Sequence, residues 1–194
     1  MGDIIPFNGI TSLDLDPDVV LEHTKGKLEG FLIAGYDKDG NVKWEDAIEN
    51  LVTTVGKNLT LDTILGNSAA GAVVMGLKGA GTPVIGDTQA SHGSWNEVGG
   101  TNAPTYSGNR KTPTFSAAAY VSGTTCTKST SSASTFAITS TGTVAGCFIN
   151  IGGSATIDDT TGTLFSAGNF TGGSRTVASG DTLNVTYTFS LDAV

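Results

Sequence analysis

The sequence has little positive charge, and this excludes one broad class of partner. Lys and Arg number 10 against 18 Asp and Glu, which gives a formal net charge of −8 over 194 residues. Binding to nucleic acid depends on clustered Lys and Arg that contact phosphates. We therefore expect no nucleic-acid partner. The first 50 residues hold 11 of the acidic side chains, so the front of the chain is an acidic tag on a nearly neutral body.

Long apolar runs and a basic hydrophobic leader are also lacking. Nowhere do about 18 consecutive apolar residues occur, the length that a membrane-spanning helix needs. Residues 1–7 contain no basic side chain that could begin a signal peptide. We expect a soluble chain that has no membrane partner and is not exported by a signal peptide.

Cysteine is scarce, because Cys126 and Cys147 are the only two. Two cysteines are too few for a disulfide framework or a zinc site. Small and apolar neighbours favour two free, packed thiols, and a disulfide between them is the alternative. No metal and no cofactor is predicted.

Histidine, the commonest general acid or base, occurs only at positions 23 and 92. His92 lies close to Ser91 and Trp95, but a Gly-x-Ser-x-Gly elbow and a third triad member are missing. We interpret this segment as a loop closing over the fold, with Trp95 buried and His92 hydrogen-bonded near the surface. No catalytic residue is predicted.

Two acidic segments could carry chemistry. Residues 37–41 begin like a calcium loop, but Val42 and Ile48 stand where that loop needs Gly and Glu, so a hairpin turn is favoured. Asp158 and Asp159 are paired carboxylates, which glycoside hydrolysis uses when they flank a cleft at a defined separation. Adjacent residues in a Thr- and Gly-rich turn are more simply a solvated loop.

What the sequence does contain is alternation of apolar and polar residues, the pattern of half-buried strands. It is clearest at the end of the chain, where residues 183, 185, 187, 189 and 191 are apolar and residues between them polar. We predict a mainly β fold, an antiparallel β-sandwich of jelly-roll-like form. Shorter runs predict further strands at residues 31–36, 42–44, 73–77, 115–121, 134–139, 144–151 and 163–170.

One run is apolar on both faces. In residues 144–151, Val144 and Phe148 point to one side and Cys147, Ile149 and Ile151 to the other. Such a strand is either central in its sheet or covered by a neighbouring subunit. The longest stretch in which we predict no strand, residues 79–110, is expected to be a loop that makes contacts.

One or two short helices are predicted between the first hairpin and the body. Asp39-Gly40 is a strong hairpin signal because both residues tolerate positive φ. Beyond it, apolar residues from Trp44 to Val55 recur at helical spacing, and a shorter helix is predicted at residues 61–65 with Thr60 or Asn58 as its cap and Gly66 as its stop.

These elements divide the chain into three parts. Residues 1–28 show no sustained period and are expected to form an extended acidic N-terminal arm. Residues 29–66 hold the hairpin and short helices, and residues 67–194 form the sandwich.

A set of Gly-, Thr- and apolar-rich scaffold segments occurs in order along the chain: residues 40–44, 50–56, 76–79, 86–93 with Trp95, 161–168 and 180–186. Together these segments resemble a family of tailed-bacteriophage virion proteins encoded near the major capsid protein. The resemblance covers roughly residues 29–190 and carries scaffold motifs rather than reactive groups. It implies a sandwich on or near the phage head that assembles as a homotrimer.

We therefore expect a non-enzymatic virion structural protein on the capsid exterior, a decoration or cement protein that stabilises the head by bridging major capsid subunits. In this hypothesis the arm and the 79–110 loop extend over neighbouring subunits, and many modest contacts are multiplied by symmetry. The alternative is a receptor-binding module of a tail fibre or spike that recognises a host-surface glycan. A depolymerase using Asp158 and Asp159 is a third hypothesis.

Overall fold

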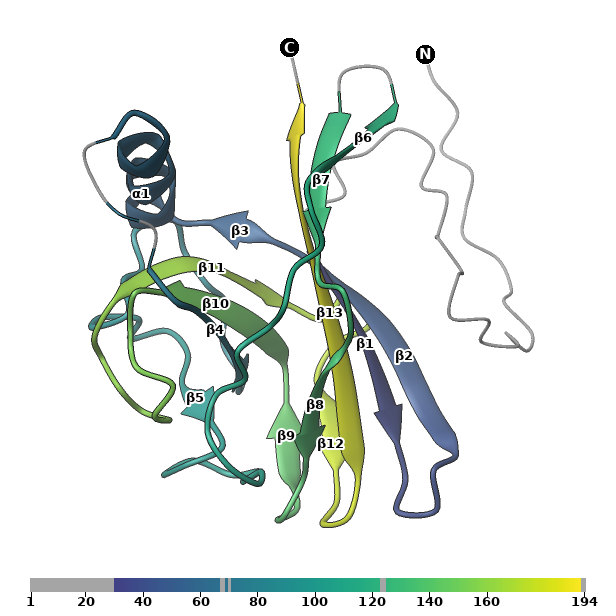
Figure 1. Cartoon of the computed structure of the whole chain (residues 1–194). Helices are drawn as coiled ribbons and strands as arrows, with labels where there is room; N and C mark the ends of the chain where they lie inside the picture. Colours follow the sequence, from purple (N-terminus) through teal and green to yellow (C-terminus); the bar gives the residue numbers. More distant parts are fainter. Residues whose placement is uncertain (1–29, 67–68, 70, 123–124, 193–194) are drawn as a thin grey trace, which may run out of the picture.

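Nearly all regular structure in this protein is β-strand. The structure, a computed structural model, describes residues 30–66, 69, 71–122 and 125–192 (Figure 1). Its helix is α1 (Thr54–Ile64). The strands are β1 (Gly30–Tyr36), β2 (Val42–Glu49), β3 (Leu51–Val52), β4 (Val73–Lys78), β5 (Glu97–Val98), β6 (Ala119–Ser122), β7 (Thr125–Ser129), β8 (Ser134–Ala137), β9 (Gly142–Val144), β10 (Gly146–Ile151), β11 (Thr163–Asn169), β12 (Arg175–Val177) and β13 (Thr182–Asp192).

The strands form two large sheets and one small ribbon, all antiparallel. One sheet has the order β2-β1-β13-β7-β6, with β8 also paired to β13, and the other has the order β3-β11-β10-β4-β5. Strands β12 and β9 form the ribbon. The predicted mainly β, sandwich-like fold is confirmed. The predicted arm, residues 1–28, lies outside the described residues.

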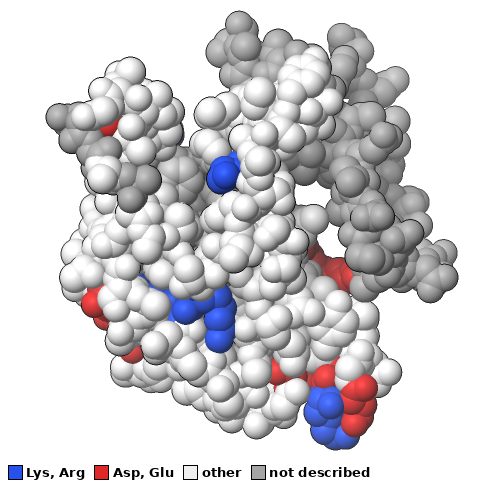
Figure 2. All heavy atoms as spheres, viewed as in Figure 1, with Lys and Arg blue, Asp and Glu red and all other residues white. Residues whose placement is uncertain are grey.

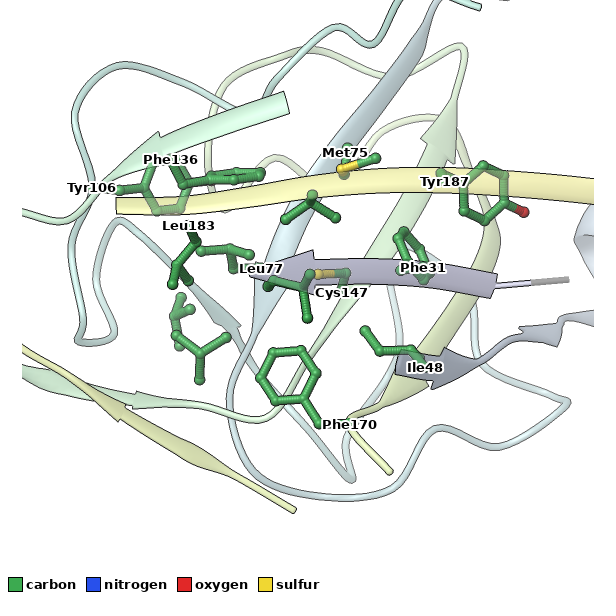
Figure 3. Packing of buried hydrophobic residues seen from close by; sticks show 14 of the residues in the cluster. Phe31, Ile48, Met75, Leu77, Tyr106, Phe136, Cys147, Phe170, Leu183 and Tyr187 are labelled. Carbon is green, nitrogen blue, oxygen red and sulfur yellow. The ribbon is translucent and has the colours of Figure 1, made fainter. Parts of the chain in front are cut away.

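The hydrophobic core lies between the two large sheets (Figure 3). From one sheet, Phe31 and Leu183 point into it, and from the other Leu77 and Cys147 do. Burying a side chain the size of Leu or Phe contributes about 1.5–3 kcal/mol, so this layer is the main source of stability. Other members include Ile48, Met75, Tyr106, Phe136, Phe170 and Tyr187.

Strand β10 is buried on both faces, as its sequence predicts for a central strand. Cys147 and Ile149 belong to the core between the sheets. Phe148 points the opposite way and packs with Trp95 and Leu164 in a second cluster. Trp95 belongs to the 79–110 segment, so the outer face is covered by a loop of the same chain. The structure also places a short strand, β5, in this segment, where none was predicted.

The predicted hairpin turn is present between β1 and β2. Gly40 has φ of 85°, the left-handed conformation that glycine adopts without a steric penalty. Asp37 fixes the turn because its carboxylate accepts hydrogen bonds from the backbone amides of Asp39 and Asn41. Asp37, which resembled the first ligand of a calcium loop, therefore serves to hold the hairpin turn.

The predicted helix over residues 44–55 is wrong, because residues 42–49 form strand β2. Every residue of β1 finds a partner in β2, from Gly30 opposite Glu49 to Tyr36 opposite Val42. This long-range pairing overrides a spacing that also suits a helix. The helix begins later, at Thr54, and Thr53 caps it by accepting a hydrogen bond from the Gly56 amide.

The second predicted helix, residues 61–65, is the end of this same helix, so the expected caps Thr60 and Asn58 are wrong. Thr60 instead donates its hydroxyl to the carbonyl of Gly56 within the helix. The predicted stop is confirmed, since α1 ends at Ile64 and Gly66 follows with φ of 81°.

Several strand boundaries differ from prediction, and two differ in a way that changes the strand itself. The run at 144–151 is interrupted at Ala145, which separates β9 from β10, and the strand expected at 115–121 is β6, at Ala119–Ser122. Strand β7, around Cys126, was not predicted. Strand β1, in the predicted 29–66 segment, pairs along its whole length with β13, so that segment is part of the sandwich sheet.

Candidate functional site

A surface pocket brings together the two groups of polar residues that the sequence singled out. It measures about 430 Å³ and lies between residues 89–97 and residues 158–160. His92 lines it from one side, and Asp158 and Asp159 line it from the other. We call it the His92 pocket. His92 and Asp158 are 66 positions apart, so the sequence does not reveal this proximity.

The loop that carries His92 is held by its own aromatic pair. The rings of His92 and Trp95 stack with centroids 4.0 Å apart, and His92 Nδ1 lies 3.1 Å from the Trp95 carbonyl oxygen. Trp95 is buried and donates its indole N–H to Asp87 at 2.9 Å. The interpretation of this segment as a loop with Trp95 buried and His92 hydrogen-bonded is confirmed. Within the described chain no hydrogen bond joins His92 to Ser91.

Glu97, which lines the pocket, belongs to a buried ion pair with Arg110. Arg110 donates through Nε to Glu97 Oε1 at 2.8 Å and through Nη2 to Oε2 at 2.6 Å. Both side chains are almost fully buried. Glu97 Oε2 also accepts the backbone amide of Asp158 at 3.0 Å. A two-bond pair of this kind fixes geometry as well as satisfying both charges.

Arg110 also holds the loop that presents the two carboxylates. Its guanidinium donates to the carbonyls of Ser154 and Asp159, at 3.1 and 2.7 Å. Asp158 has φ of 63°, a conformation uncommon outside glycine, and its Oδ2 accepts the Thr101 amide. The loop is therefore held from several sides, while Asp158 itself is exposed, as predicted for a solvated loop, and Asp159 is half-buried.

Asp159 is fixed by its neighbour Thr161. Its Oδ1 accepts the Thr161 hydroxyl and, at 2.7 Å, the Thr161 amide. These hydrogen bonds lower the pKa of Asp159 below its ordinary value of 3.8, because they favour the charged form. At neutral pH the pocket thus presents an ionised carboxylate here.

Lys78 lies beneath the loop that carries Trp95, and sequence reasoning missed it. Its Nζ donates to the carbonyls of Gly79 and Gly81 and to the side-chain oxygen of Asn169, and it lies 5.6 Å from the Trp95 ring centre. Burial lowers the pKa of Lys78 from 10.5 to about 8. Lys78 is therefore a structural cation that ties loop ends together.

These buried charges carry a signal that sequence reasoning could have used. Lys78 and Glu97 are isolated charges in a body rich in Gly, Thr and apolar residues, and Arg110 stands beside one other charge, Lys111. Charged residues are rarely fully buried unless they are paired, so single charges beside strand-like runs are candidates for buried networks. Their partners could not be read from spacing.

A second, apolar hollow of about 460 Å³ lies between α1 and the end of β13. Figure 2 shows it as a notch whose walls carry few charged side chains. Leu61 and Leu191 open into solvent with 58% and 54% of their surface exposed. We call this the α1–β13 groove, lined by Asn50, Leu51, Val52, Lys57, Thr60, Leu61, Phe189 and Leu191.

The groove forms where β13 extends beyond β1. Pairing between them ends at Gly30 opposite Thr188, while β13 continues to Asp192 beside β7. The predicted alternation fails here, because Ser190 is buried and Leu191, expected in the core, is exposed. Large exposed apolar side chains in a cluster mark interaction surfaces more often than isolated ones do.

The two cysteines are free in the structure, but they differ in environment. Cys147 is fully buried in the core, and burial raises its pKa well above the ordinary value. Cys126 is exposed on β7, so the prediction that both are packed is wrong for this residue.

Thiol labelling of the native protein is expected to modify one cysteine per chain. Cys126 should react with a water-soluble disulfide reagent, whereas Cys147 should react only after unfolding, because both access and thiolate formation are blocked. Cys126→Ser should abolish native labelling. Two fast-reacting thiols in the wild type would contradict the packing described around Cys147.

Asp46 on β2 anchors the turn after β11. Its carboxylate accepts hydrogen bonds from Arg175, at 2.6 Å, and from the Thr171 hydroxyl and the Gly172 amide. Burial acts to raise the pKa of Asp46, but these hydrogen bonds outweigh it, and the pKa lies below 3.8.

Asp46→Asn is expected to lower the free energy of unfolding by about 2 kcal/mol at pH 7, since hydrogen bonds to charged groups contribute about 1.5–3 kcal/mol. A lowered folded-state pKa stabilises the fold above pH 3.8 and ceases to do so as pH falls through the folded pKa. The difference between wild type and variant should therefore shrink in acid. Urea titrations at pH 7 and in strong acid measure it, and a constant difference would contradict the assignment.

Metal binding finds no support in the described part of the chain, where no three His, Cys, Asp or Glu side chains group closely enough to hold an ion. Across those same residues, no helix is long and apolar enough to cross a membrane. Comparison with known proteins found no match among family models, curated proteins or solved structures.

Proposed function

We propose that this chain is a non-enzymatic virion structural protein, a decoration or cement protein that stabilises a phage head by bridging major capsid subunits on the capsid exterior. The α1–β13 groove is the observation that carries the proposal, because it is an apolar surface suited to protein contacts. The resemblance of several scaffold segments to phage virion proteins supports the choice of partner.

A second copy of this chain is the occupant we assign to the groove. Ile64 and Leu65, at the end of α1, are exposed by 65% and 79% and lie just beyond the groove residue Leu61. An apolar knob beside an apolar hollow suits a head-to-tail contact, in which the helix end of one copy enters the groove of the next. Such contacts close into rings, and a homotrimer is the ring we propose.

Attachment to the head is assigned to the N-terminal segment, because the 79–110 loop is otherwise engaged. Trp95 of that loop packs on Phe148, and the Thr54 amide donates to the Ile85 carbonyl, so the loop lies against its own body. We therefore do not assign contacts with neighbouring capsid subunits to this loop.

Deleting residues 2–28 is expected to reduce the occupancy of capsids at least ~10-fold, because we assign attachment to the head to these residues. Occupancy is measured by adding purified protein to heads that lack it and sedimenting the particles. The deleted protein should keep its oligomeric state, which rests on the α1–β13 groove. Unchanged occupancy would contradict the role given to this segment.

A receptor-binding module of a tail fibre or spike is the second candidate, and the His92 pocket favours it. The pocket carries several polar side chains, and Glu97 in its wall is held by the buried pair with Arg110, as a recognition site needs. Gold-labelled antibody against this chain distinguishes the candidates in electron micrographs. Label over the head supports decoration, and label at the tail tip supports the receptor-binding module.

A further inference from the structure

Some polar atoms of the His92 pocket have hydrogen-bond partners and others have none, and Gln89 shows this most clearly. Its side chain is 98% buried, since only 2% of its surface is exposed. Its Nε2 donates to the Asp159 carbonyl at 3.2 Å, and that partner can only accept, so the amide orientation is fixed. Gln89 Oε1 is left without a partner in the described chain. An unpaired buried oxygen costs about 1–3 kcal/mol unless a ligand or water supplies a donor.

His92 offers a second acceptor. Because the Trp95 carbonyl accepts only, the proton of the neutral ring lies on Nδ1. The other nitrogen, Nε2, is then an acceptor, and it has no hydrogen-bond partner among the described residues.

Asp158 uses Oδ2 to accept the Thr101 amide and keeps Oδ1 as a free acceptor among the described residues. Asp159 accepts Thr161 through Oδ1 and also accepts a backbone hydrogen bond from Ser154. Arg110, whose guanidinium reaches the Asp159 carbonyl, is paired with Glu97, and its charge lowers the pKa of Asp159 without an ion pair between them. The pocket therefore has two carboxylates, neither of which forms an ion pair with a described cation.

Asn102 adds to the same pattern. Its Nδ2 donates to the Glu97 carbonyl at 3.0 Å, which leaves Oδ1 as an acceptor. The free groups of the pocket are thus mainly acceptors, distributed around its wall. Phosphates, sulfates and carboxylates are excluded as ligands, because they would bring further acceptors and negative charge.

We propose that the His92 pocket binds a neutral sugar, whose hydroxyl groups donate to Asp158, Asp159, His92 and Gln89. A ligand with several donors around one ring can satisfy acceptors spread over a wall, whereas a single ammonium group would reach only one or two. The volume of about 430 Å³ falls within the ~300–1,000 Å³ of small-molecule sites. This site does not depend on the virion assignment, so either proposal can fail alone.

Titration of the full-length protein with a panel of sugars tests the proposal. The probes are the methyl glycosides of glucose, galactose, mannose and N-acetylglucosamine, with sialic acid and inorganic phosphate as anionic probes. Saturation-transfer NMR should show binding of at least one neutral glycoside with a Kd of about 1–10 mM, and of neither anion. No binding of any neutral glycoside at about 50 mM, or preferred binding of an anion, would overturn the proposal.

Two variants place the binding in the pocket. Asp159→Ala should weaken it at least ~10-fold, since a hydrogen bond to a charged group contributes about 1.5–3 kcal/mol. Asp158→Asn should weaken it as well, and asparagine tolerates the positive φ at that position, so this variant keeps the test valid if the first does not fold. Asp62→Ala, a matched charge removal on the exposed surface of α1, should bind like the wild type. Equal loss in all three variants would show that binding lies elsewhere.

Discussion

Arg110→Met is expected to lower the free energy of unfolding by about 3–5 kcal/mol, the range observed when one partner of a buried ion pair is removed. Glu97 is only 4% exposed, so its carboxylate would remain buried without Arg110. The backbone amide of Asp158 would then be the donor that remains to this carboxylate. The Ser154 carbonyl would lose its donor from Arg110, and the Asp159 carbonyl would keep only the donor from Gln89. Urea unfolding monitored by Trp fluorescence measures the change.

Two control variants isolate the effect of the buried charge. Lys38→Met removes a cation whose side chain is 73% exposed beside Asp39 in the hairpin turn, and it should change stability by less than about 0.5 kcal/mol. The double variant Glu97→Met with Arg110→Met should be more stable than Arg110→Met alone, because no uncompensated charge remains buried. If Arg110→Met lowered the free energy of unfolding as little as Lys38→Met, the buried pair would not hold the wall of the His92 pocket as described.

Replacing Leu61 and Leu191 together by Asp is expected to abolish self-association and to lower capsid occupancy at least ~10-fold. An association that seats apolar side chains would have to bury two charges, which is strongly unfavourable without partners. Both residues are more than half exposed in the single chain, so its folding should be nearly unaffected. Light scattering after size-exclusion chromatography gives the oligomeric state, and thermal unfolding confirms the fold.

Val42→Asp is the matched control for this experiment. Val42, at the start of β2, is 48% exposed but does not line the groove. This variant should assemble like the wild type. Wild-type assembly of the Leu61 and Leu191 variant would remove the groove from the account, whereas loss of assembly in both variants would show a general effect of surface charge.

The sheets were predictable where alternation is local. Leu183, Val185 and Tyr187 alternate with polar residues and are all buried, because β13 has β1 on one side over this stretch. Beyond Thr188 that neighbour ends, and Leu191 is exposed against expectation. Alternation within a strand does not reveal where its neighbouring strand stops.

The error at β2 has a different cause. Residues four and eight apart, such as Trp44, Ile48 and Val52, share a face in a strand as well as approximately in a helix. The spacing was therefore compatible with both structures. The deciding factor was the pairing of β2 with β1, which continues for the whole length of the hairpin.

The His92 pocket could be anticipated only in pieces. His92 with Trp95 and Asp158 with Asp159 were recognised as separate loops, and neither segment indicates the other. Contacts such as that between Glu97 and the Asp158 amide join positions 61 residues apart, through a fold that the sequence determines only in outline. The groove was missed for a similar reason, since helices were predicted at residues 44–55 and 61–65 instead of one helix at Thr54–Ile64.

The copy number of this chain relative to the major capsid protein tests the central claim most directly. Gel densitometry on purified particles measures it, with the major capsid protein as internal standard. The decoration proposal predicts a ratio set by the capsid lattice, such as one to one, because contacts of modest strength stabilise a head only when symmetry repeats them. A few copies per particle, or none, would contradict it.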